Sequence, residues 1–199
     1  MSGIEQAVEA LAQGRMIIIT GDRLRGGDID FAIAARYVTA DAVNFMASYG
    51  RGLICLAMRP ERAVKLGISL INPGAERQSG RPFGRSIEAR AGVSTGISAA
   101  DRTQTIRVAM ASESTGDDLV SPGHVFPLIA APGGVRERAA AVEASIELCK
   151  LAGAGDMAVI CSIMRDDGEM ARIEDLDALV TRHAIPVADI GALLDRLGS

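Results

Sequence analysis

The sequence predicts a mixed α/β (α+β) fold, built as one domain over residues 1–199. Short apolar segments rich in β-branched residues, such as 16–20 and 53–58, have the length and composition of buried strands. Longer segments with apolar residues at helical spacing, such as 3–14 and 136–152, lie among them. The two kinds alternate irregularly and some strands adjoin, so we expect a mixed sheet rather than a regular doubly wound one. A chain of this length can bury a substantial core as one domain.

The first half of the chain contains three further elements and a loop. Residues 30–35 are a second candidate strand, which follows a glycine-rich loop. Thr39 is the expected N-cap of a helix that ends near Gly50. A short helix with Pro in its first turn is expected at 59–67. Residues 68–82 are polar and contain Gly and Pro, which predicts a connecting loop.

The second half of the chain has the same patterns and no internal repeat. The elements expected there are, in order, a strand at 83–89, a helix capped near Ser98, a strand within 121–134, the helix at 136–152, a strand at 156–164, a hairpin-type turn at 166–172, and helices at 174–183 and 189–197.

The composition argues against several classes of function, namely nucleic-acid binding, membrane insertion and secretion. The net charge is −4 and the positive charge is almost all Arg, scattered singly, so we expect no nucleic-acid partner. Arg does suit planar recognition of carboxylate or phosphate groups. No apolar segment approaches the ~20 residues that cross a bilayer, and the N-terminus does not resemble a secretory signal. We therefore expect a cytoplasmic protein without a membrane partner, with Cys55, Cys149 and Cys161 as buried core thiols.

A charged glycine loop follows the first strand and is a candidate site. It carries Arg25, Asp28 and Asp30 between two buried strands, where the backbone can approach a ligand closely. The alternatives are a solvated turn, or a clamp in which Arg25 pairs with one of the two aspartates.

Other polar segments supply further candidates. Ser94, Thr95 and Ser98 lie before a helix, where free backbone amides and hydroxyls favour an anion. Taken alone, this segment is more often a capping turn, and Asp101 on the same helix is expected to be structural. His124 lies between Gly and Val, and by itself it would more often be a structural histidine. Arg138 could hold an anion or form an ion pair with Glu143.

Together these segments resemble 3,4-dihydroxy-2-butanone 4-phosphate synthase, an enzyme family of riboflavin biosynthesis. The matching words are VTADAVNFMASYGRGLICLAM, GVSTGISAADRTQTI, SPGHVFPLIAAPGGVRERA and ICSIMRDDGEMAR. The similarity extends almost end to end and implies a compact single domain of the synthase type. It also implies a homodimer whose active sites use both subunits. The family converts ribulose 5-phosphate to formate and the butanone phosphate with Mg²⁺.

The resemblance also places site residues. Aligned without gaps on the family loop Arg-Glu-Asn-Glu-Gly-Asp, this chain retains the substrate-contacting Arg25 and Asp30 but has Gly26 for the metal-binding Glu. The phosphate-contacting Arg138 and the essential His124 are also retained. Three further family positions differ: the metal-binding His is Ala141, the substrate-binding Thr is Val142 and the catalytic Glu is Ser162.

These differences predict a diverged enzyme. Gly and Ala offer no ligand atom to Mg²⁺, so we expect no metal site, and Mg²⁺ only where the original reaction is retained. The predicted function is acid/base chemistry on a small phosphorylated or anionic sugar-like metabolite, by His124 with Asp28 or Asp30. Arg25, Arg138, Ser94, Thr95 and Ser98 would bind the substrate. The alternatives are a genuine synthase, or an inactive paralogue that binds a metabolite or an active subunit.

Overall fold

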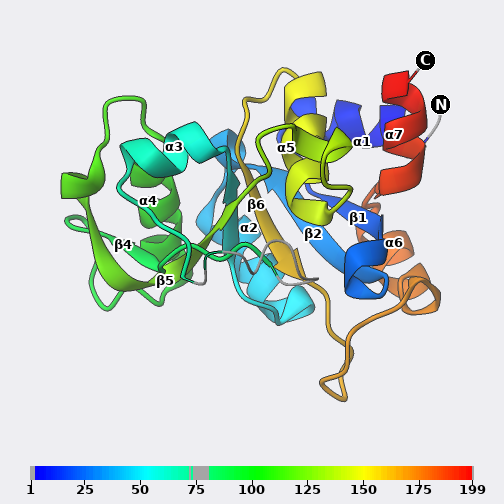
Figure 1. The fold of residues 1–199 in the computed structure, drawn as a ribbon. Helices are drawn as coiled ribbons and strands as arrows, with labels where there is room; N and C mark the ends of the chain where they lie inside the picture. Colours follow the sequence, from blue (N-terminus) through cyan, green and yellow to red (C-terminus); the bar gives the residue numbers. More distant parts are fainter. Residues whose placement is uncertain (1–2, 72, 74–80, 199) are drawn as a thin grey trace.

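The computed structural model describes residues 3–71, 73 and 81–198, and these residues form one α/β domain around a mixed sheet (Figure 1). The strands are β1 (Ile17–Asp22), β2 (Asp28–Ala34), β3 (Cys55–Met58), β4 (Ile87–Ala89), β5 (Leu119–Ile129), β6 (Ala158–Ser162) and β7 (Val187–Asp189). Their order across the sheet is β4-β5-β3-β6-β2-β1-β7. The pairs β3/β5 and β1/β7 are parallel and the other neighbours are antiparallel. The mixed α/β prediction is therefore confirmed.

Helices cover both faces of the sheet (Figure 1). They are α1 (Gly3–Ala12), α2 (Ala40–Phe45), α3 (Pro60–Lys65), α4 (Ala99–Met110), α5 (Ala141–Leu151), α6 (Asp177–His183) and α7 (Ile190–Gly198). Helices α1, α5 and α7 pack on one face, and α2 and α4 on the other. A π-helical turn, Met46–Gly50, extends α2.

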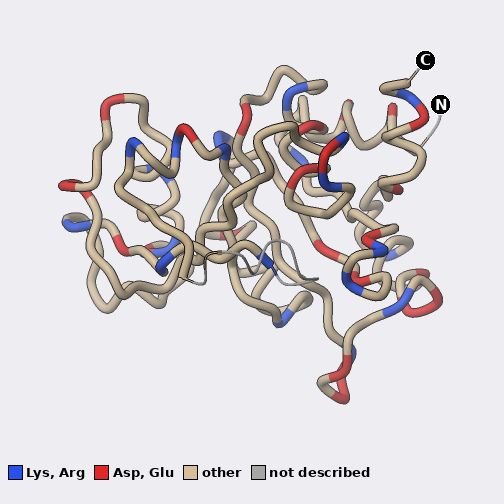
Figure 2. The backbone as a smooth tube through the Cα atoms, viewed as in Figure 1, with Lys and Arg blue, Asp and Glu red and all other residues tan. Residues whose placement is uncertain are grey.

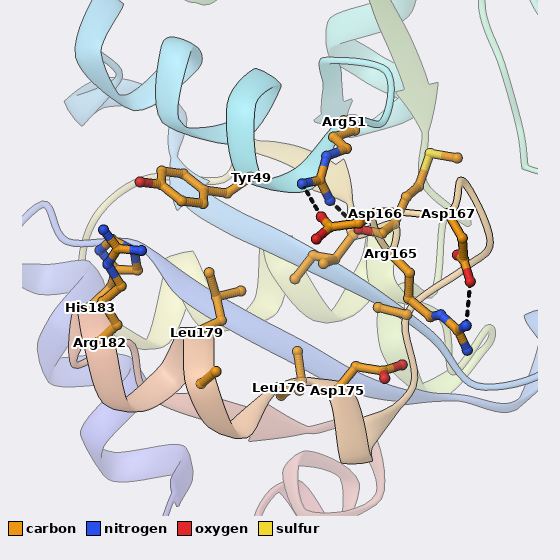
Figure 3. Close-up of a pocket in the computed structure, with 14 residues that line it drawn as sticks. Tyr49, Arg51, Arg165, Asp166, Asp167, Asp175, Leu176, Leu179, Arg182 and His183 are labelled. Atoms are coloured by element: carbon orange, nitrogen blue, oxygen red, sulfur yellow. Dashed lines mark hydrogen bonds and ion pairs between the residues drawn. The ribbon is translucent and has the colours of Figure 1, made fainter.

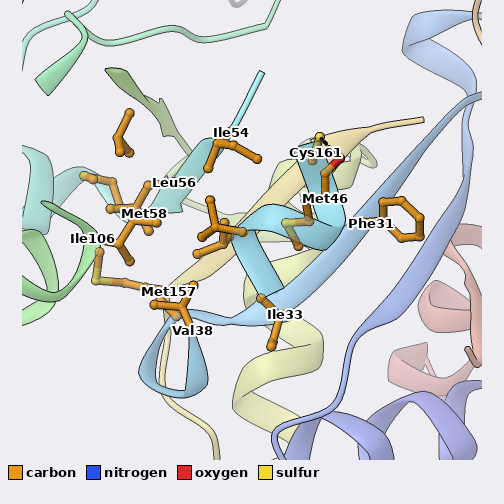
Figure 4. Packing of buried hydrophobic residues seen from close by; sticks show 14 of the residues in the cluster. Phe31, Ile33, Val38, Met46, Ile54, Leu56, Met58, Ile106, Met157 and Cys161 are labelled. Carbon is orange, nitrogen blue, oxygen red and sulfur yellow. Dashed lines mark hydrogen bonds between the residues drawn. The ribbon is translucent and has the colours of Figure 1, made fainter. Parts of the chain in front are cut away.

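The two faces of β2 show why the sheet is covered on both sides. Phe31 and Ile33 pack into one apolar cluster with residues of α2 and α4 (Figure 4). Ala32 and Ala34 point the other way and pack with α1 and α5. Side chains alternate between faces along a strand, so apolar residues on both faces give a continuous apolar run. Their burial is the main source of stability for the fold.

Several elements differ from the sequence prediction. Strand β7 was missed and pairs in parallel with β1 at the sheet edge. Helix α5 begins at Ala141, because Ala140 has extended dihedral angles (φ −130°, ψ 164°). Strand β4 begins only at Ile87, although Phe83 forms an isolated bridge to Leu128. Of the predicted loop at 68–82, residues 72 and 74–80 lie outside the described residues.

The predicted core thiols are confirmed. Cys55, Cys149 and Cys161 are buried and free, and burial raises the pKa of each to about 12. Among the described residues, no helix has the length and apolar character needed to span a bilayer. Figure 2 shows Lys and Arg positions interspersed with Asp and Glu positions along the described chain.

Candidate functional site

The turn between β1 and β2 brings the charged loop residues together. A single 3₁₀ turn, Arg23–Arg25, leaves β1, and Gly26 and Gly27 return the chain with φ of +65° and +84°. Glycine adopts these left-handed angles without steric cost, and a Cβ at either position would contact nothing within 4 Å. The glycines therefore serve the turn and leave the space above it open.

Five charged residues form what we call the Asp30 cluster: Asp22, Arg25, Asp28, Asp30 and Arg81. Arg25 Nη2 donates to Asp28 Oδ2 at 2.5 Å, and Arg25 Nη1 lies 4.0 Å from Asp22 Oδ2 and 3.9 Å from Asp30 Oδ2. The clamp considered from the sequence is therefore present, and it joins Arg25 to the aspartates of both strands.

Arg81 provides the second cation of the cluster and was not predicted. Its Nη2 donates to Asp30 Oδ1 and to Ser162 Oγ, both at 2.6 Å, and Ser162 Oγ donates to Asp30 Oδ1 at 2.8 Å. The side chain of Asp30 is 0% exposed and that of Arg81 is 8% exposed. Burial alone would lower the pKa of Arg81, but the charge and hydrogen bond of Asp30 outweigh it and raise that pKa. Arg81 therefore stays charged in this cluster.

Asp22 joins the Asp30 cluster to the start of α5. Its Oδ2 accepts a hydrogen bond from the backbone N–H of Ala141 at 3.0 Å, which satisfies one free donor at the helix N-terminus. Burial raises the pKa of Asp22 above its ordinary value of 3.8. Asp22 Oδ1, Asp30 Oδ2 and Arg25 Nη1 are buried without a hydrogen-bond partner among the described residues. The centre of the cluster is therefore incompletely bonded.

The donor atoms of the Asp30 cluster do not fit the Mg²⁺ ion that the resemblance implies. Mg²⁺ requires oxygen donors free to approach at octahedral geometry, whereas Asp28 and Asp30 already receive hydrogen bonds from guanidinium groups. Within the described part of the chain, no three His, Cys, Asp or Glu side chains are placed to hold a metal ion together. The positions aligned with the family metal ligands are Gly26 and Ala141, which bring no donor side chain.

Arg138, the other predicted anion holder, forms a buried ion pair. Arg138 Nη2 donates to Glu143 Oε1, which also accepts from the backbone N–H of Ala131 at 2.8 Å. Burial raises the pKa of Glu143, and the Arg138 guanidinium offsets this effect only in part. The ion pair considered from the sequence is therefore present. An anion at Arg138 would have to share that cation with Glu143.

An open cavity of about 510 Å³ lies beside Arg138. Leu24 of the 3₁₀ turn, Pro82 and Ile129 contribute apolar walls, and Arg138 and Glu137 supply its charge. Side chains of the described residues thus leave this cavity open, and it has the volume of a small-molecule site.

His124 lies in a second group of residues, which we call the His124 cluster and which also contains Glu88 and Thr105. His124 Nδ1 lies 2.6 Å from Glu88 Oε2, and Thr105 Oγ1 donates to Glu88 Oε1 at 3.1 Å. The three side chains come from β5, β4 and α4. Within one chain, the carboxylate that contacts His124 is therefore Glu88. A catalytic partnership of His124 with Asp28 or Asp30 stays a prediction. Strands β3 and β6 separate β5 from β2, which carries both aspartates.

The turn before α4 is held by Asp101. Asp101 accepts hydrogen bonds from the backbone N–H groups of Ser94 and Gly96 and from Ser94 Oγ, and these lower its pKa. Ser98 Oγ caps the helix by accepting from the Asp101 N–H. The capping turn and the structural role of Asp101 are therefore present. Thr95 is exposed at the tip, and the role of all three hydroxyls in substrate binding stays a prediction.

A separate cavity of about 640 Å³ contains none of the predicted site residues (Figure 3). Tyr49 and Arg51 lie on one side, and Arg182 and His183 of α6 on the other. Two ion pairs lie at this cavity, Arg51 with Asp166 and Arg165 with Asp167 (Figure 3).

Sequence reasoning missed two functional candidates, Glu88 and Arg81. Each is a single charged residue without a local motif, and its partner lies far along the chain: 36 residues separate Glu88 from His124, and 51 separate Arg81 from Asp30. Glu88 did have one usable signal, because it is an acidic residue inside a segment predicted as a strand.

Comparison with known proteins identifies the family. The profile of the family 3,4-dihydroxy-2-butanone 4-phosphate synthase matches residues 5–196. A riboflavin biosynthesis protein RibBA of Aquifex aeolicus is 46% identical over 96% of this chain and 48% of its own length. A 3,4-dihydroxy-2-butanone 4-phosphate synthase of Chromobacterium violaceum is 39% identical over 98% of this chain and 92% of its own length. The chain spans about half the length of several curated relatives that it matches, including the Aquifex aeolicus protein.

Solved structures agree with this assignment. A crystal structure of 3,4-dihydroxy-2-butanone 4-phosphate synthase in complex with two magnesium ions superposes with a TM-score of 0.91 at 31% identity, covering 99% of this chain and 97% of that one. A two-domain synthase, RibBX from A. baumannii, gives a TM-score of 0.89 at 39% identity, with 96% of this chain and 56% of that one covered. The profile match, the relatives and the shared fold lead to one conclusion: this chain belongs to the 3,4-dihydroxy-2-butanone 4-phosphate synthase family.

Proposed function

We propose that this chain is an enzyme that binds a small phosphorylated or otherwise anionic sugar-like metabolite and acts on it by acid/base chemistry. The observation that carries the proposal is the match of nearly the whole chain to proteins named for one reaction, at 39–42% identity. The arrangement of the site is compatible with it, because guanidinium groups, a paired histidine and an open cavity all lie on this domain.

The first candidate reaction is that of the family, conversion of ribulose 5-phosphate to formate and 3,4-dihydroxy-2-butanone 4-phosphate. The comparisons favour it over the diverged reaction predicted from the sequence, because the relatives carry this name. Such chemistry begins by removing a proton from carbon next to a carbonyl group, so it needs a base and a positive charge for the enediolate. We assign the base to His124 and the positive charge to Arg25 and Arg81, since the side chains present do not fit Mg²⁺.

The second candidate is a diverged, metal-independent reaction on a related anionic metabolite. The specific observation that favours it is the ion pair of Arg81 with Asp30. Arg81 also donates a hydrogen bond to Ser162, the residue aligned with the family's catalytic Glu. The apolar walls of the cavity beside Arg138 suit a ligand less polar than a sugar phosphate. Arg138, Arg25 and the hydroxyls of Ser94, Thr95 and Ser98 remain the proposed substrate contacts.

We further propose that the protein is a homodimer whose active sites are shared between copies. Support comes from the separation of the His124 cluster and the Asp30 cluster by two strands within one chain. An active site that uses both clusters therefore needs them to meet across an interface.

Formate release from ribulose 5-phosphate tests the first candidate. The purified chain is incubated with the sugar phosphate, first with Mg²⁺ and then with EDTA, and formate is followed by ¹H NMR, with His124→Ala as control. Formate that depends on His124 in both conditions supports the family reaction driven by the protein's own cations. Formate that requires Mg²⁺ contradicts our assignment of Arg25 and Arg81.

Absence of formate in both conditions would rule out the first candidate. Isothermal titration with ribulose 5-phosphate and with inorganic phosphate then separates the remaining possibilities. Binding that is lost in Arg25→Gln supports the diverged enzyme or the inactive paralogue, and absence of binding overturns the proposal of an anionic sugar-like ligand.

A further inference from the structure

We propose that Glu88 is the positioning residue of His124 and holds its imidazole in the tautomer that is protonated on Nδ1. Nε2 then carries the lone pair and is the atom that takes a proton from substrate. This inference rests on the proposed function, in which His124 is the acid/base, and it adds which nitrogen acts and which residue fixes it.

The hydrogen bonds around Glu88 define the direction of each donor. Thr105 Oγ1 accepts from the backbone N–H of Ala89 at 3.1 Å and donates its own proton to Glu88 Oε1. The other oxygen, Oε2, lies 2.6 Å from His124 Nδ1. An ionised carboxylate only accepts hydrogen bonds, so the proton of this short contact belongs to Nδ1. The neutral ring has one N–H, and Nε2 is therefore left without a proton.

The surroundings of Glu88 prevent its carboxylate from turning away. Glu88 is 8% exposed and Thr105 is fully buried. Gly96, in the turn before α4, packs so closely that a Cβ there would lie 1.9 Å from Glu88 Oε2. Gly123 beside His124 is tied to the neighbouring strand segment by its N–H, which donates to Ser86 Oγ at 3.1 Å. The carboxylate of Glu88 is thus held by packing, and the backbone beside His124 is held by a hydrogen bond.

The side chain of His124 is accessible to solvent, whereas Glu88 is buried. The His124 side chain is 42% exposed, although Nδ1 faces the carboxylate. A buried carboxylate that holds one imidazole nitrogen, with the ring otherwise accessible, orients a general base and stabilises the imidazolium that forms when the ring accepts a proton. The substrate proton therefore moves from carbon to Nε2, and the Nδ1 proton stays between His124 and Glu88.

Long-range ¹H–¹⁵N NMR of the full chain tests the tautomer directly. The chain has only two histidines, so His183→Gln assigns both rings. We expect a protonated Nδ1 and an unprotonated Nε2 for neutral His124 in the wild type. In Glu88→Ala we expect a mixture of both tautomers. A wild-type ring protonated on Nε2, or a ring unchanged by Glu88→Ala, would overturn the inference.

Two further measurements keep this test independent of folding. The His183 signals, from a ring that packs against Phe45 and Tyr49, report whether each variant is folded. Thr105→Val is the matched control, because it removes a bond to Oε1 but leaves Oε2 opposite Nδ1. We expect Thr105→Val to retain the wild-type tautomer of His124. A mixture of tautomers in this variant would show that Thr105, not Glu88, determines the tautomer of the His124 ring.

A kinetic measurement follows if the chain releases formate. Glu88→Gln should lower kcat about 10- to 100-fold with little change in KM, since it alters the base and not the binding contacts, and Glu88→Asp should recover part of the loss. A rise in KM of similar size, with kcat unchanged, would contradict a positioning role. The NMR result does not depend on turnover, so the tautomer can be as expected even if the synthase reaction fails.

Discussion

At the residue scale, Asp30 and Arg81 form a buried ion pair in the candidate site. Both side chains are almost fully buried and joined at 2.6 Å. Asp30→Asn would leave the Arg81 charge without its counter-ion in a poorly solvated place, and we expect a loss of about 3–5 kcal/mol in the free energy of unfolding. Urea denaturation followed by circular dichroism measures it.

The matched control for this variant is Asp166→Asn. Asp166 also pairs with an arginine, Arg51, but its side chain is 94% exposed. Pairs in water contribute about 0–1 kcal/mol, so this variant should be close to wild type. Equal losses in the two variants would show that the burial of Asp30 has no special effect.

Asp22 gives a pH dependence whose sign follows from its raised pKa. Burial raises the pKa of Asp22 above 3.8, so the folded protein keeps a proton that the unfolded chain has released. Its contribution to stability is fully present below the unfolded pKa and is lost as pH rises through the folded value. Relative to Asp22→Asn, the wild type should therefore lose unfolding free energy as pH rises above about 4.

Urea denaturation of both proteins between pH 4 and 7 measures this difference. Asparagine keeps an oxygen for the Ala141 N–H that Asp22 accepts, so helix α5 retains that bond in the variant. A difference that is flat, or that grows in favour of the wild type with pH, would contradict the assignment.

At the scale of elements, the turn before α4 is packed against the carboxylate of β4 at Gly96. Gly96 has a φ of +83°, which alone costs alanine about 1–2 kcal/mol. Its Cβ would also overlap Glu88 Oε2, so Gly96→Ala should lose about 2–4 kcal/mol in total and disturb the His124 signals. Thermal unfolding and the NMR experiment measure the two effects.

Gly153 separates the two causes. It also has a positive φ, of +63°, but a Cβ there would contact nothing within 4 Å. Gly153→Ala should therefore show only the backbone cost and leave His124 unchanged. If both variants lose the same stability, the close packing of Gly96 on Glu88 is not significant.

Local patterns predicted those elements whose stability is local. The caps at Thr39 and Ser98 were predicted from residue type and are present. The start of α5 was not, because residues 136–140 are compatible with a helix. In the structure Arg138 instead bonds to Glu143 and to the Ile129 carbonyl. These tertiary contacts accompany an extended Ala140, and no periodicity in the sequence reports them.

The candidate site was predictable in the same uneven way. Arg25, Asp28 and Asp30 lie within six residues of one another, so their grouping followed from a single loop. Arg81 and Glu88 acquire their roles only when the sheet brings together strands distant in sequence. The contact of His124 with Glu88 within one chain was not predicted, because the sequence does not give the strand order.

At the scale of the whole molecule, sharing of active sites predicts complementation between inactive variants. His124→Ala and Arg25→Gln alter different clusters, so a mixed dimer would keep one site with both clusters intact. After subunit exchange we expect about one quarter of the wild-type activity, since random pairing makes half the dimers mixed, each with one working site. The formate assay measures it, and light scattering gives the oligomeric state.

The control mixes two variants of the same cluster, His124→Ala and Glu88→Ala. No pairing of these two restores an intact His124 cluster opposite an intact Asp30 cluster, so no comparable recovery is expected. Equal recovery in both mixtures, or none in the first, would contradict shared sites.

The three buried cysteines give the native protein an unreactive thiol background. Each has a pKa of about 12, so almost no thiolate is present near neutral pH. A cysteine placed at exposed Thr95 or Asp166 would therefore be modified by maleimides far faster than the natural ones. Spectroscopic probes could thus be attached singly, and distances across the proposed dimer measured without first removing any native residue.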